Sequence, residues 1–292
     1  MTLPQVSIVM PTYKPAHFEQ ALRSAIGQTY PNTEILVSDN CPTEQIRDIC
    51  ARFPQVIYQR CSVIRADNVI SAFFSGKGQF VKPLFDDDLL HPFCIERMVA
   101  SATSRPDVEL VFSASQVIDA NNMRVETRRP FDVSGTMTGL ELQRNMTLGM
   151  RNFVGEFSSI LFRRATLWRI GPHRLFEIGG HDCTNGLADV AAYFNLAEHG
   201  VASYIDEELS YFRRDQTLES NSNPASNPNL GYCFSDYIDL LPAAHATGKI
   251  STAELLATEA QVTEVQLSLR GIFTQIAPSF ERYGAYLQTL KD

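Results

Sequence analysis

The sequence predicts an α/β fold, in which a mostly parallel sheet flanked by helices is followed by a mainly helical C-terminal extension. Three observations lead to this prediction. Strand and helix patterns alternate between residues 6 and 85, which is typical of a parallel sheet with right-handed crossovers. Polar residues follow three of the predicted strands at their carboxyl ends. After Ala100 the alternation gives way to shorter strands and then to helical patterns.

Apolar and β-branched runs predict the first four strands, at residues 6–10, 34–38, 56–58 and 80–85. Helices are predicted between these strands. The helical spacing of apolar residues predicts the first over residues 18–26. Thr43 is suited to cap a second helix that runs to Arg52, and a third begins at Asp67 or Asn68 and ends at Gly76. A further helix is predicted over 93–100, with Pro92 near its first turn.

The most informative stretch is the acidic triplet Asp86, Asp87 and Asp88, which lies where the fourth predicted strand ends and a helix is about to begin. In open α/β sheets, ligands bind at this edge. Adjacent carboxylates repel one another unless a cation or water screens them, and Mg²⁺ is bound by one or two carboxylates together with phosphate oxygens and water. The triplet therefore indicates a metal–diphosphate site. The alternative is a solvated acidic turn that caps the next helix.

Two other predicted strands also end in polar residues, Thr12 and Tyr13 after the first and Asp39 and Asn40 after the second. Because the carboxyl ends of parallel strands share one edge, these residues and the acidic triplet are expected to converge. A nucleotide along that edge would use Asp39 on its base or ribose. Neither a GxGxxG nor a GxxxxGK[ST] motif is present, so a metal ion is expected to meet the phosphate charge.

Composition restricts the possible partners and the cellular location. The net charge is -8 and no basic tract stands out, so nucleic acid is not expected as a partner. None of the six Cys is paired in a CxxC motif, so we predict no zinc knuckle and interpret the Cys as reduced core thiols of a cytosolic protein. We also predict neither a signal peptide nor a transmembrane segment, because no suitable apolar run is present.

The middle of the chain predicts further strands at residues 109–113, 116–118, 123–126, 159–162, 201–205 and 208–212. Helices are predicted at 139–147, through Trp168, and over 187–199, the last closed by Gly200. His181 and Trp168 are interpreted as structural residues. The run 220–228 is the most loop-like stretch of the chain.

Beyond Thr252 the pattern predicts one long helix with an apolar stripe. The stripe is formed by Val262, Val265, Leu269, Ile272, Phe273 and Ile276. We interpret it as core packing. A docking face for a second subunit is the first alternative, and a membrane-surface helix is the second, although its polar side lacks Lys and Arg.

Several motifs together resemble family 2 glycosyltransferases. The resemblance is carried by residues 6–13, 26–32 and 34–39, by the acidic triplet with Pro92, and by segments 153–156, 161–164 and 204–214. Asp189, eleven residues before Gly200, is similar to the family's Asp-bearing helix. The resemblance implies the GT-A fold for residues 1–222, with a nucleotide-binding half over 1–100 and an acceptor half over 101–222. Residues 223–292 lie outside it.

The resemblance also implies roles for individual residues. Contacts to the nucleotide are implied for Pro11, Thr12, Tyr13, Asp39, Asn68 and Asp87. Asp88 and Asp86 would bind Mg²⁺ or Mn²⁺, and Asp189 would be the catalytic base, with Asp182 as the rival. Contacts to the acceptor or the diphosphate are implied for Glu156, Asp182, Arg213 and Arg214.

The sequence departs from the family pattern at three places. Asn40-Cys41 follows Asp39, Asp67 precedes Asn68 where the family often has Arg, and Asp215 stands where a His is common. Arg65 is the nearest substitute for the missing Arg.

The implied activity is a metal-dependent, inverting transfer of a hexose from a UDP- or dTDP-sugar to a saccharide or lipid-linked saccharide acceptor, in bacterial surface polysaccharide or glycoconjugate synthesis. The expected location is the cytoplasm, with peripheral contact at the inner face of the membrane and a homo-oligomer through the C-terminal helix left open. A nucleotidyltransferase is one alternative, but residues 11–16 are not the Gly-rich basic loop that such enzymes carry. A non-catalytic nucleotide-sugar binder is the other, and the intact triplet and Asp189 argue against it.

Overall fold

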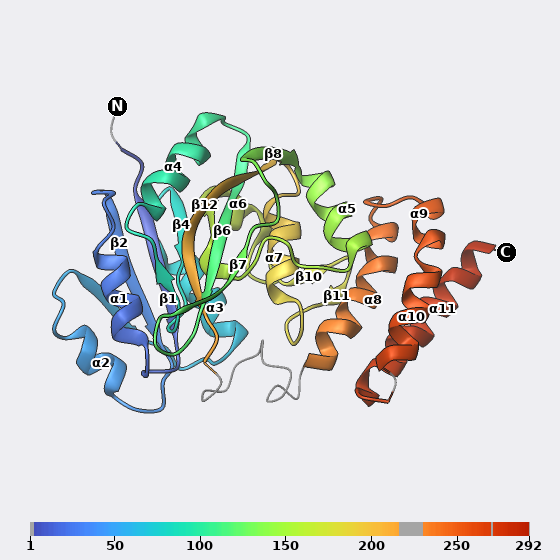
Figure 1. The fold of residues 1–292 in the computed structure, drawn as a ribbon, viewed down its shortest axis with the longest axis horizontal. Helices are drawn as coiled ribbons and strands as arrows, with labels where there is room; N and C mark the ends of the chain where they lie inside the picture. The colour runs from blue at the N-terminus through green and yellow to red at the C-terminus, as the bar shows by residue number, and fades with distance from the viewer. Residues whose placement is uncertain (1–2, 216–229, 270, 292) are drawn as a thin grey trace. The chain divides into compact units, whose positions relative to one another are not determined.

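The computed structural model describes residues 3–215, 230–269 and 271–291 (Figure 1). Contacts divide the chain into two compact units. The first unit comprises Met1–Met137, Val154–Pro172 and His199–Asp215. The second comprises Thr138–Phe153, His173–Glu198 and the described residues from 230 onward. The predicted boundary between residues 222 and 223 lies outside the described residues.

The alternation predicted for the first part of the chain is confirmed in the first unit. Its strands and helices are β1 (Val6–Thr12), α1 (Phe18–Ile26), β2 (Thr33–Asp39), α2 (Gln45–Cys50), β3 (Val56–Arg60), α3 (Ala66–Ser75) and β4 (Phe80–Pro83). The four strands are parallel and lie in the order β3-β2-β1-β4. Thr12 pairs with Asp39 and Asp39 with Arg60, so the carboxyl ends of these strands meet at one edge.

The remaining strands extend this sheet. Their bounds are β5 (Leu89–Leu90), β6 (Val108–Ile118), β7 (Arg124–Arg128), β8 (Gly135–Thr138), β9 (Ile160–Arg163) and β12 (Val201–Arg213). β9 is antiparallel to β4 and β6, and β12 is parallel to β6.

Two predicted strand breaks were wrong. β6 continues through the buried Ala114 and Ser115, whose small side chains interrupt an apolar run without disrupting the ladder. β12 continues past Asp206 and Glu207, where the register shifts and a bulge accommodates the extra residues.

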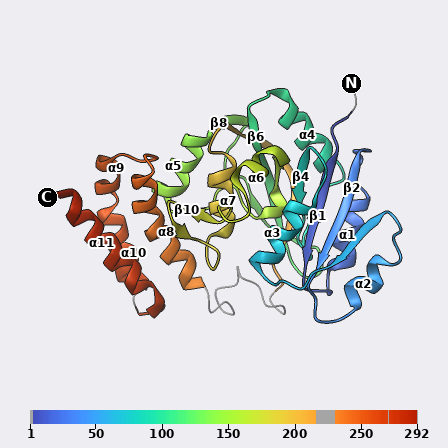
Figure 2. The same ribbon diagram turned by 180° about the vertical axis from the view of Figure 1, so that it is seen from behind.

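Helices cover both faces of the sheet (Figures 1 and 2). α1 and α4 (Cys94–Ser104) pack on one face, where Phe18, Leu22 and Met98 join the side chains of Ile8 and other sheet residues in one buried cluster. α3 and α6 (Arg164–Ile170) lie on the opposite face, and a short 3₁₀ turn, η1 (Phe157–Ser159), precedes β9. The apolar spacing that predicted α1 is the spacing of its buried side chains.

One predicted helix start was wrong. The N-cap of α2 is Glu44 and not Thr43, and the Glu44 side chain makes no capping hydrogen bond. The Thr43 hydroxyl accepts a long hydrogen bond, 3.5 Å, from the Gln45 N–H and lies 3.3 Å from Cys41 Sγ. α3 begins after Arg65, an exposed residue with a φ of 55°.

The second unit is mainly helical. Its elements are α5 (Gly139–Gly149), β10 (Glu177–Ile178), β11 (His181–Asp182), α7 (Ala188–Leu196), α8 (Leu230–Ala246), α9 (Thr252–Ala257), α10 (Glu259–Leu269), η2 (Thr274–Ile276) and α11 (Ala277–Lys291). β10 and β11 form an antiparallel hairpin. No helix within the described part of the chain is both long and apolar enough to cross a membrane.

The single long helix predicted beyond Thr252 was wrong. A capping box of Ser251 and Glu254 begins α9, the chain then forms α10, and η2 and α11 follow. Val262 of α10 and Ile276 of η2 are buried, but Ile272, in the turn between them, is 68% exposed, so the predicted stripe is not one continuous buried face. α8 was not predicted, and Pro242 lies inside it.

Candidate active site

The loop that follows β1 is fixed by the first carboxylate of the triplet. Asp86 Oδ2 accepts hydrogen bonds from the backbone N–H groups of Tyr13 and Lys14, both at 2.6 Å. Asp86 is buried, and burial, followed by repulsion from Asp87, raises its pKa to about 6 although the two N–H groups oppose this shift. Asp86 therefore holds the predicted nucleoside residues at the sheet edge.

Asp87 is the most exposed carboxylate of the triplet. Its side chain is 21% exposed, and Oδ2 lies 3.5 Å from Lys14 Nζ. Its backbone carbonyl accepts a hydrogen bond from Arg213 Nε at 2.8 Å. The carboxylate thus faces outward from a firmly held backbone.

Asp88 is buried, and Oδ1 accepts a hydrogen bond from the Arg213 backbone N–H at 3.0 Å. Burial, then the charge of Asp87 and more weakly that of Glu156, raises the Asp88 pKa well above its usual range, while hydrogen bonds from Ser158 and Arg213 act in the opposite direction. Glu156 pairs through Oε1 with Arg128, and its buried Oε2 has no hydrogen-bond partner among the described residues. The negative charges of Asp87 and Glu156 therefore both act on the Asp88 carboxylate.

Lys82 forms part of the support beneath the triplet. Its fully buried Nζ donates to the carbonyls of Pro83 at 2.9 Å and Ser158 at 2.5 Å, and burial lowers its pKa to about 8. The Ser158 hydroxyl accepts a hydrogen bond from the Phe85 N–H at 3.1 Å. These bonds join the end of β4 to η1, which directly follows Glu156.

The two arginines at the end of β12 differ in their surroundings. The Arg213 guanidinium is buried and donates to the carbonyls of Asp87 and Asp119, both at 2.8 Å, and to Asn122 Oδ1 at 2.6 Å. Burial lowers its pKa, against the effect of the nearby carboxylates. Arg214 is 40% exposed and lies 3.3 Å from Glu126. Arg213 thus ties strand ends together, and Arg214 is the more accessible cation.

A His–Asp pair also forms in the first unit, between His17 and Asp215. His17 Nε2, just before α1, lies 2.9 Å from Asp215 Oδ2, and both side chains are largely buried. Sequence reasoning had noted Asp215 but missed His17. The two residues are 198 positions apart, so no local pattern could have joined them.

The predicted nucleotide contacts Asp39 and Asn68 belong to a buried network after β2. Asp39 accepts hydrogen bonds from the Cys41 N–H at 2.7 Å, the Tyr58 hydroxyl at 2.8 Å and Arg60 Nη1 at 2.9 Å. Burial and the Asp39 carboxylate raise the pKa of Tyr58 to about 12.

The Asn68 side-chain amide donates to the Ser38 carbonyl and accepts from its hydroxyl. Pro11 and Thr12 are buried, whereas the Tyr13 side chain is 54% exposed. Tyr13 therefore presents a ring at the edge that this network and Asp86 hold in place.

The two candidate bases lie in the second unit. Asp189, in the first turn of α7, accepts hydrogen bonds from Asn152 Nδ2 at 2.7 Å and from the Val190 N–H at 2.8 Å. Asp182 is exposed, and Oδ1 accepts from both the N–H and the hydroxyl of Thr184. The Asp182 carboxylate thus stabilises its own turn, and two donors orient that of Asp189.

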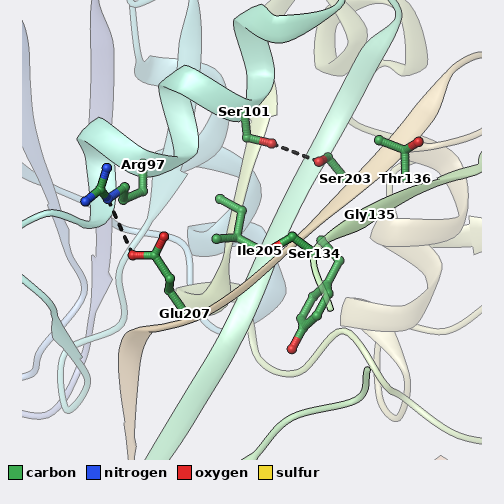
Figure 3. A pocket seen from close by; sticks show the side chains of 9 residues that line it. Arg97, Ser101, Ser134, Gly135, Thr136, Ser203, Ile205 and Glu207 are labelled. Atoms are coloured by element: carbon green, nitrogen blue, oxygen red, sulfur yellow. Dashed lines mark hydrogen bonds and ion pairs between the residues drawn. The ribbon is translucent and has the colours of Figure 1, made fainter. Parts of the chain in front are cut away.

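A separate hollow of about 380 Å³ lies in the first unit between α4, β8 and β12 (Figure 3). Ser101 and Ser203 hydrogen-bond within it at 2.8 Å, and Arg97 lies 3.4 Å from Glu207. None of the predicted site residues lines it, so it is not the predicted nucleotide site.

The fold is similar to that of solved glycosyltransferase structures. TarS of S. aureus, residues 1–349, in complex with UDP-GlcNAc has a TM-score of 0.66 and 12% identity, with 97% of this chain and 81% of that chain covered. The complex of the same TarS fragment with UDP has a TM-score of 0.61 and 14% identity, with 91% of this chain and 72% of that chain covered.

Curated relatives match a shorter part of the chain. Protein CgeD of Bacillus subtilis (strain 168) is 23% identical over 176 residues, and uncharacterized protein y4gI of Sinorhizobium fredii is 24% identical over 179 residues. These matches cover 56% and 58% of this chain but only 39% and 19% of the relatives' own lengths. The model of the family "Glycosyl transferase family 2" matches residues 7–171. Because this match covers more than half of the chain, the protein belongs to glycosyltransferase family 2 and has the GT-A fold.

Proposed function

We propose that the protein transfers a hexose from a UDP- or dTDP-sugar to a hydroxyl group, with inversion at the anomeric carbon. The observation that carries the proposal is the hydrogen-bonded edge at which Asp86 holds Tyr13 and Lys14 beside the Asp39 network. The TarS structures contain UDP and UDP-GlcNAc, which supports a uridine donor. In this proposal the exposed ring of Tyr13 would contact the base, and the Lys14 ammonium group, 3.5 Å from Asp87, would contact the phosphates.

The oxygen donors at the triplet fit Mg²⁺ or Mn²⁺. Asp87 and Glu156 both repel the Asp88 carboxylate, and the buried Glu156 Oε2 has no hydrogen-bond partner in the described residues. A hard divalent ion takes such oxygens together with phosphate and water. We assign Asp88 as the main protein ligand, with Asp87 facing the ribose or the ion, while Asp86 acts mainly through the loop that it holds. When bound, the ion would stabilise the charge of the leaving diphosphate.

Asp189 is the proposed general base. In a single displacement, the acceptor oxygen bonds to the anomeric carbon as the bond to the diphosphate breaks, and the hydroxyl proton passes to the carboxylate. Asn152 and the Val190 N–H orient that carboxylate. The Asp182 carboxylate is held in its own turn by Thr184, which favours Asp189 over its rival.

The acceptor is proposed to be a saccharide or lipid-linked saccharide, in bacterial surface polysaccharide or glycoconjugate synthesis on the cytoplasmic side of the membrane. We keep Glu156 and Arg214 as candidate contacts to the acceptor or diphosphate, because Glu156 has an unpartnered oxygen and Arg214 is accessible. Arg213 is proposed to act by fixing the backbone of Asp87 and Asp88. We also propose that two copies of this chain associate through their C-terminal helices.

A nucleotide-sugar screen tests this function. Candidate UDP- and dTDP-sugars would be assayed for thermal stabilisation and slow hydrolysis, with Mn²⁺ and with EDTA. The proposal predicts Mn²⁺-dependent stabilisation and release of the nucleoside diphosphate by one or more donors. Equal binding in EDTA would refute the metal assignment. Release of pyrophosphate from a nucleoside triphosphate and a sugar phosphate would instead indicate a nucleotidyltransferase, and binding without any turnover would indicate a binding protein.

A further inference from the structure

Three metal-binding side chains meet in the second unit, away from the acidic triplet in sequence. His181 lies in β11, Cys183 follows it directly, and Asp236 projects from α8. One nitrogen, one sulfur and one oxygen atom of these residues all lie within 4.8 Å of one another. Cys183 and Asp236 are buried, whereas the His181 side chain is 25% exposed and leaves a path from solvent.

The backbone around this group is firmly positioned. Asp236 Oδ2 accepts a hydrogen bond from the Leu187 N–H at 2.8 Å, and Oδ1 lies 3.0 Å from His181 Nε2. The Cys183 N–H donates to the Phe176 carbonyl at 2.9 Å. A Cβ at Gly186 would lie 2.3 Å from Asp236 Oδ2, so only glycine allows the loop to approach α8 this closely.

The geometry is close to that of a tetrahedral site. Bond lengths of about 2.0–2.1 Å to nitrogen or oxygen and about 2.3 Å to sulfur place neighbouring ligand atoms roughly 3.3–3.8 Å apart. The separation of His181 and Asp236 is 3.0 Å, and the thiol lies within 4.8 Å, so shifts of about 1 Å complete the arrangement. Cys233 lies one helical turn before Asp236, with Sγ 3.5 Å from the Gly186 carbonyl. It is not one of the three residues whose ligand atoms lie within 4.8 Å of one another, so it would have to move closer to take the fourth position.

The local charge also favours a cation. The charges of four carboxylates act on the Cys183 side chain, and they belong to Asp236, Asp182, Asp239 and Asp189. Arg282 is already paired with Asp239 at 2.6 Å. The sulfur ligand disfavours Mg²⁺ and Ca²⁺, whereas a mixture of nitrogen, sulfur and carboxylate oxygen suits Zn²⁺.

We propose that His181, Cys183 and Asp236 bind a structural Zn²⁺ ion, with Cys233 or a water molecule as the fourth ligand. On binding, the Cys183 thiol releases its proton to water and the sulfur bonds to the ion. His181 releases to water the Nε2 proton of its hydrogen bond to Asp236, binds the ion through Nε2 and carries its remaining proton on Nδ1. Asp236 exchanges its hydrogen bond to His181 for a bond to the ion and keeps the one from Leu187. The ion would join β11 to α8 and fix the chain just before α7.

Metal analysis of the full chain tests the proposal. Untagged protein from a zinc-supplemented culture would be measured by elemental mass spectrometry after gel filtration, and we expect about one zinc ion per chain. His181→Gln and Cys183→Ser should each lose most of this zinc and lower the melting temperature. Cys61→Ser, which removes a half-buried thiol in the first unit, should retain it. Asp88→Ala should also retain it, which separates this site from the proposed Mg²⁺ or Mn²⁺ site.

Two results would overturn the proposal. One is the absence of zinc from the wild-type protein, and the other is full zinc content in both the His181 and Cys183 variants. If Cys183→Ser does not fold, wild-type protein loaded with Co²⁺ provides a second measurement. The proposal predicts a thiolate-to-cobalt charge-transfer band, and a spectrum without one would contradict Cys183 as a ligand. If the proposal is overturned, the hydrogen bond between His181 and Asp236 would serve only to hold β11 against α8.

Discussion

Replacing Asp86 by Asn should stabilise the ligand-free protein at neutral pH. The Asp86 pKa is about 6 in the folded protein and 3.8 ordinarily, chiefly because the carboxylate is buried and secondly because Asp87 repels it. Asn preserves the shape, and its carbonyl oxygen can still accept from the Tyr13 and Lys14 N–H groups. The substitution therefore removes a buried charge while keeping the two hydrogen bonds that hold the loop.

The size and pH dependence of the effect follow from the pKa difference. A raised pKa means that the folded state binds the proton more tightly, so this contribution to stability is complete below pH 3.8 and is lost as the pH rises through about 6. A shift of about 2 units corresponds to roughly 2–3 kcal/mol. Asp86→Asn should therefore exceed the wild type in unfolding free energy by up to this amount at pH 7 and by almost nothing at pH 4.

Urea unfolding at pH 4, 5, 6 and 7, followed by tryptophan fluorescence and circular dichroism, measures this difference. A variant less stable than the wild type at pH 7 would refute the reasoning, because the carboxylate would then be net stabilising. The same variant also tests the role of Asp86. Asn keeps both hydrogen bonds to the loop, so if Asp86 acts only through them, the affinity for UDP with Mn²⁺ should change by less than the roughly 10–100-fold that loss of a metal's supporting contacts costs. If Asp86 binds the ion, the Mn²⁺-dependent part of the affinity should be lost.

Three further outcomes are expected. UDP or dTDP with Mn²⁺ should raise the melting temperature, and Asp88→Ala should abolish the metal-dependent part; equal stabilisation in EDTA would contradict this. Asp189→Asn should lower the turnover of transfer by about 10²–10⁴-fold while the nucleotide affinity stays near normal. Asp182→Asn should lower the turnover much less. A larger loss of turnover in the Asp182 variant than in the Asp189 variant would make Asp182 the base. Truncation before Thr252 removes α9 to α11 and with them the hydrogen bonds of Arg282 to Asp239. It should lower the melting temperature or change the oligomeric state while nucleotide binding persists. An unchanged oligomeric state, melting temperature and activity would rule this out.

The parallel half of the sheet was predictable because its signals are local. Phe18, Ala21, Leu22 and Ala25 recur at helical spacing, and they are the residues that α1 buries. Strand runs and breakers placed β1 to β4 in the correct order along the chain. The meeting of the Tyr13 loop with Asp86 follows from the topology, because parallel strands bring their carboxyl ends to one edge.

Contacts between distant residues could not be predicted in the same way. His17 meets Asp215 across 198 positions. Burial of Arg213 among backbone carbonyls and side-chain amides depends on four separate segments coming together, around residues 20, 87, 119–122 and 213. No local spacing pattern could join His181 to Asp236, because Asp236 comes from a helix 55 residues away. The prediction of one long helix beyond Thr252 was wrong because the helical spacing of apolar residues continues past the end of α10 at Leu269.

The most direct test of the central claim is the anomeric configuration of the released sugar. The wild-type protein would be incubated with Mn²⁺ and the α-linked nucleotide-sugar that it hydrolyses, and the first sugar formed would be followed by proton NMR before mutarotation. A single displacement with Asp189 as the base predicts initial release of the β-anomer, and release that is lost in Asp88→Ala and strongly slowed in Asp189→Asn. Initial release of the α-anomer would contradict the inverting mechanism.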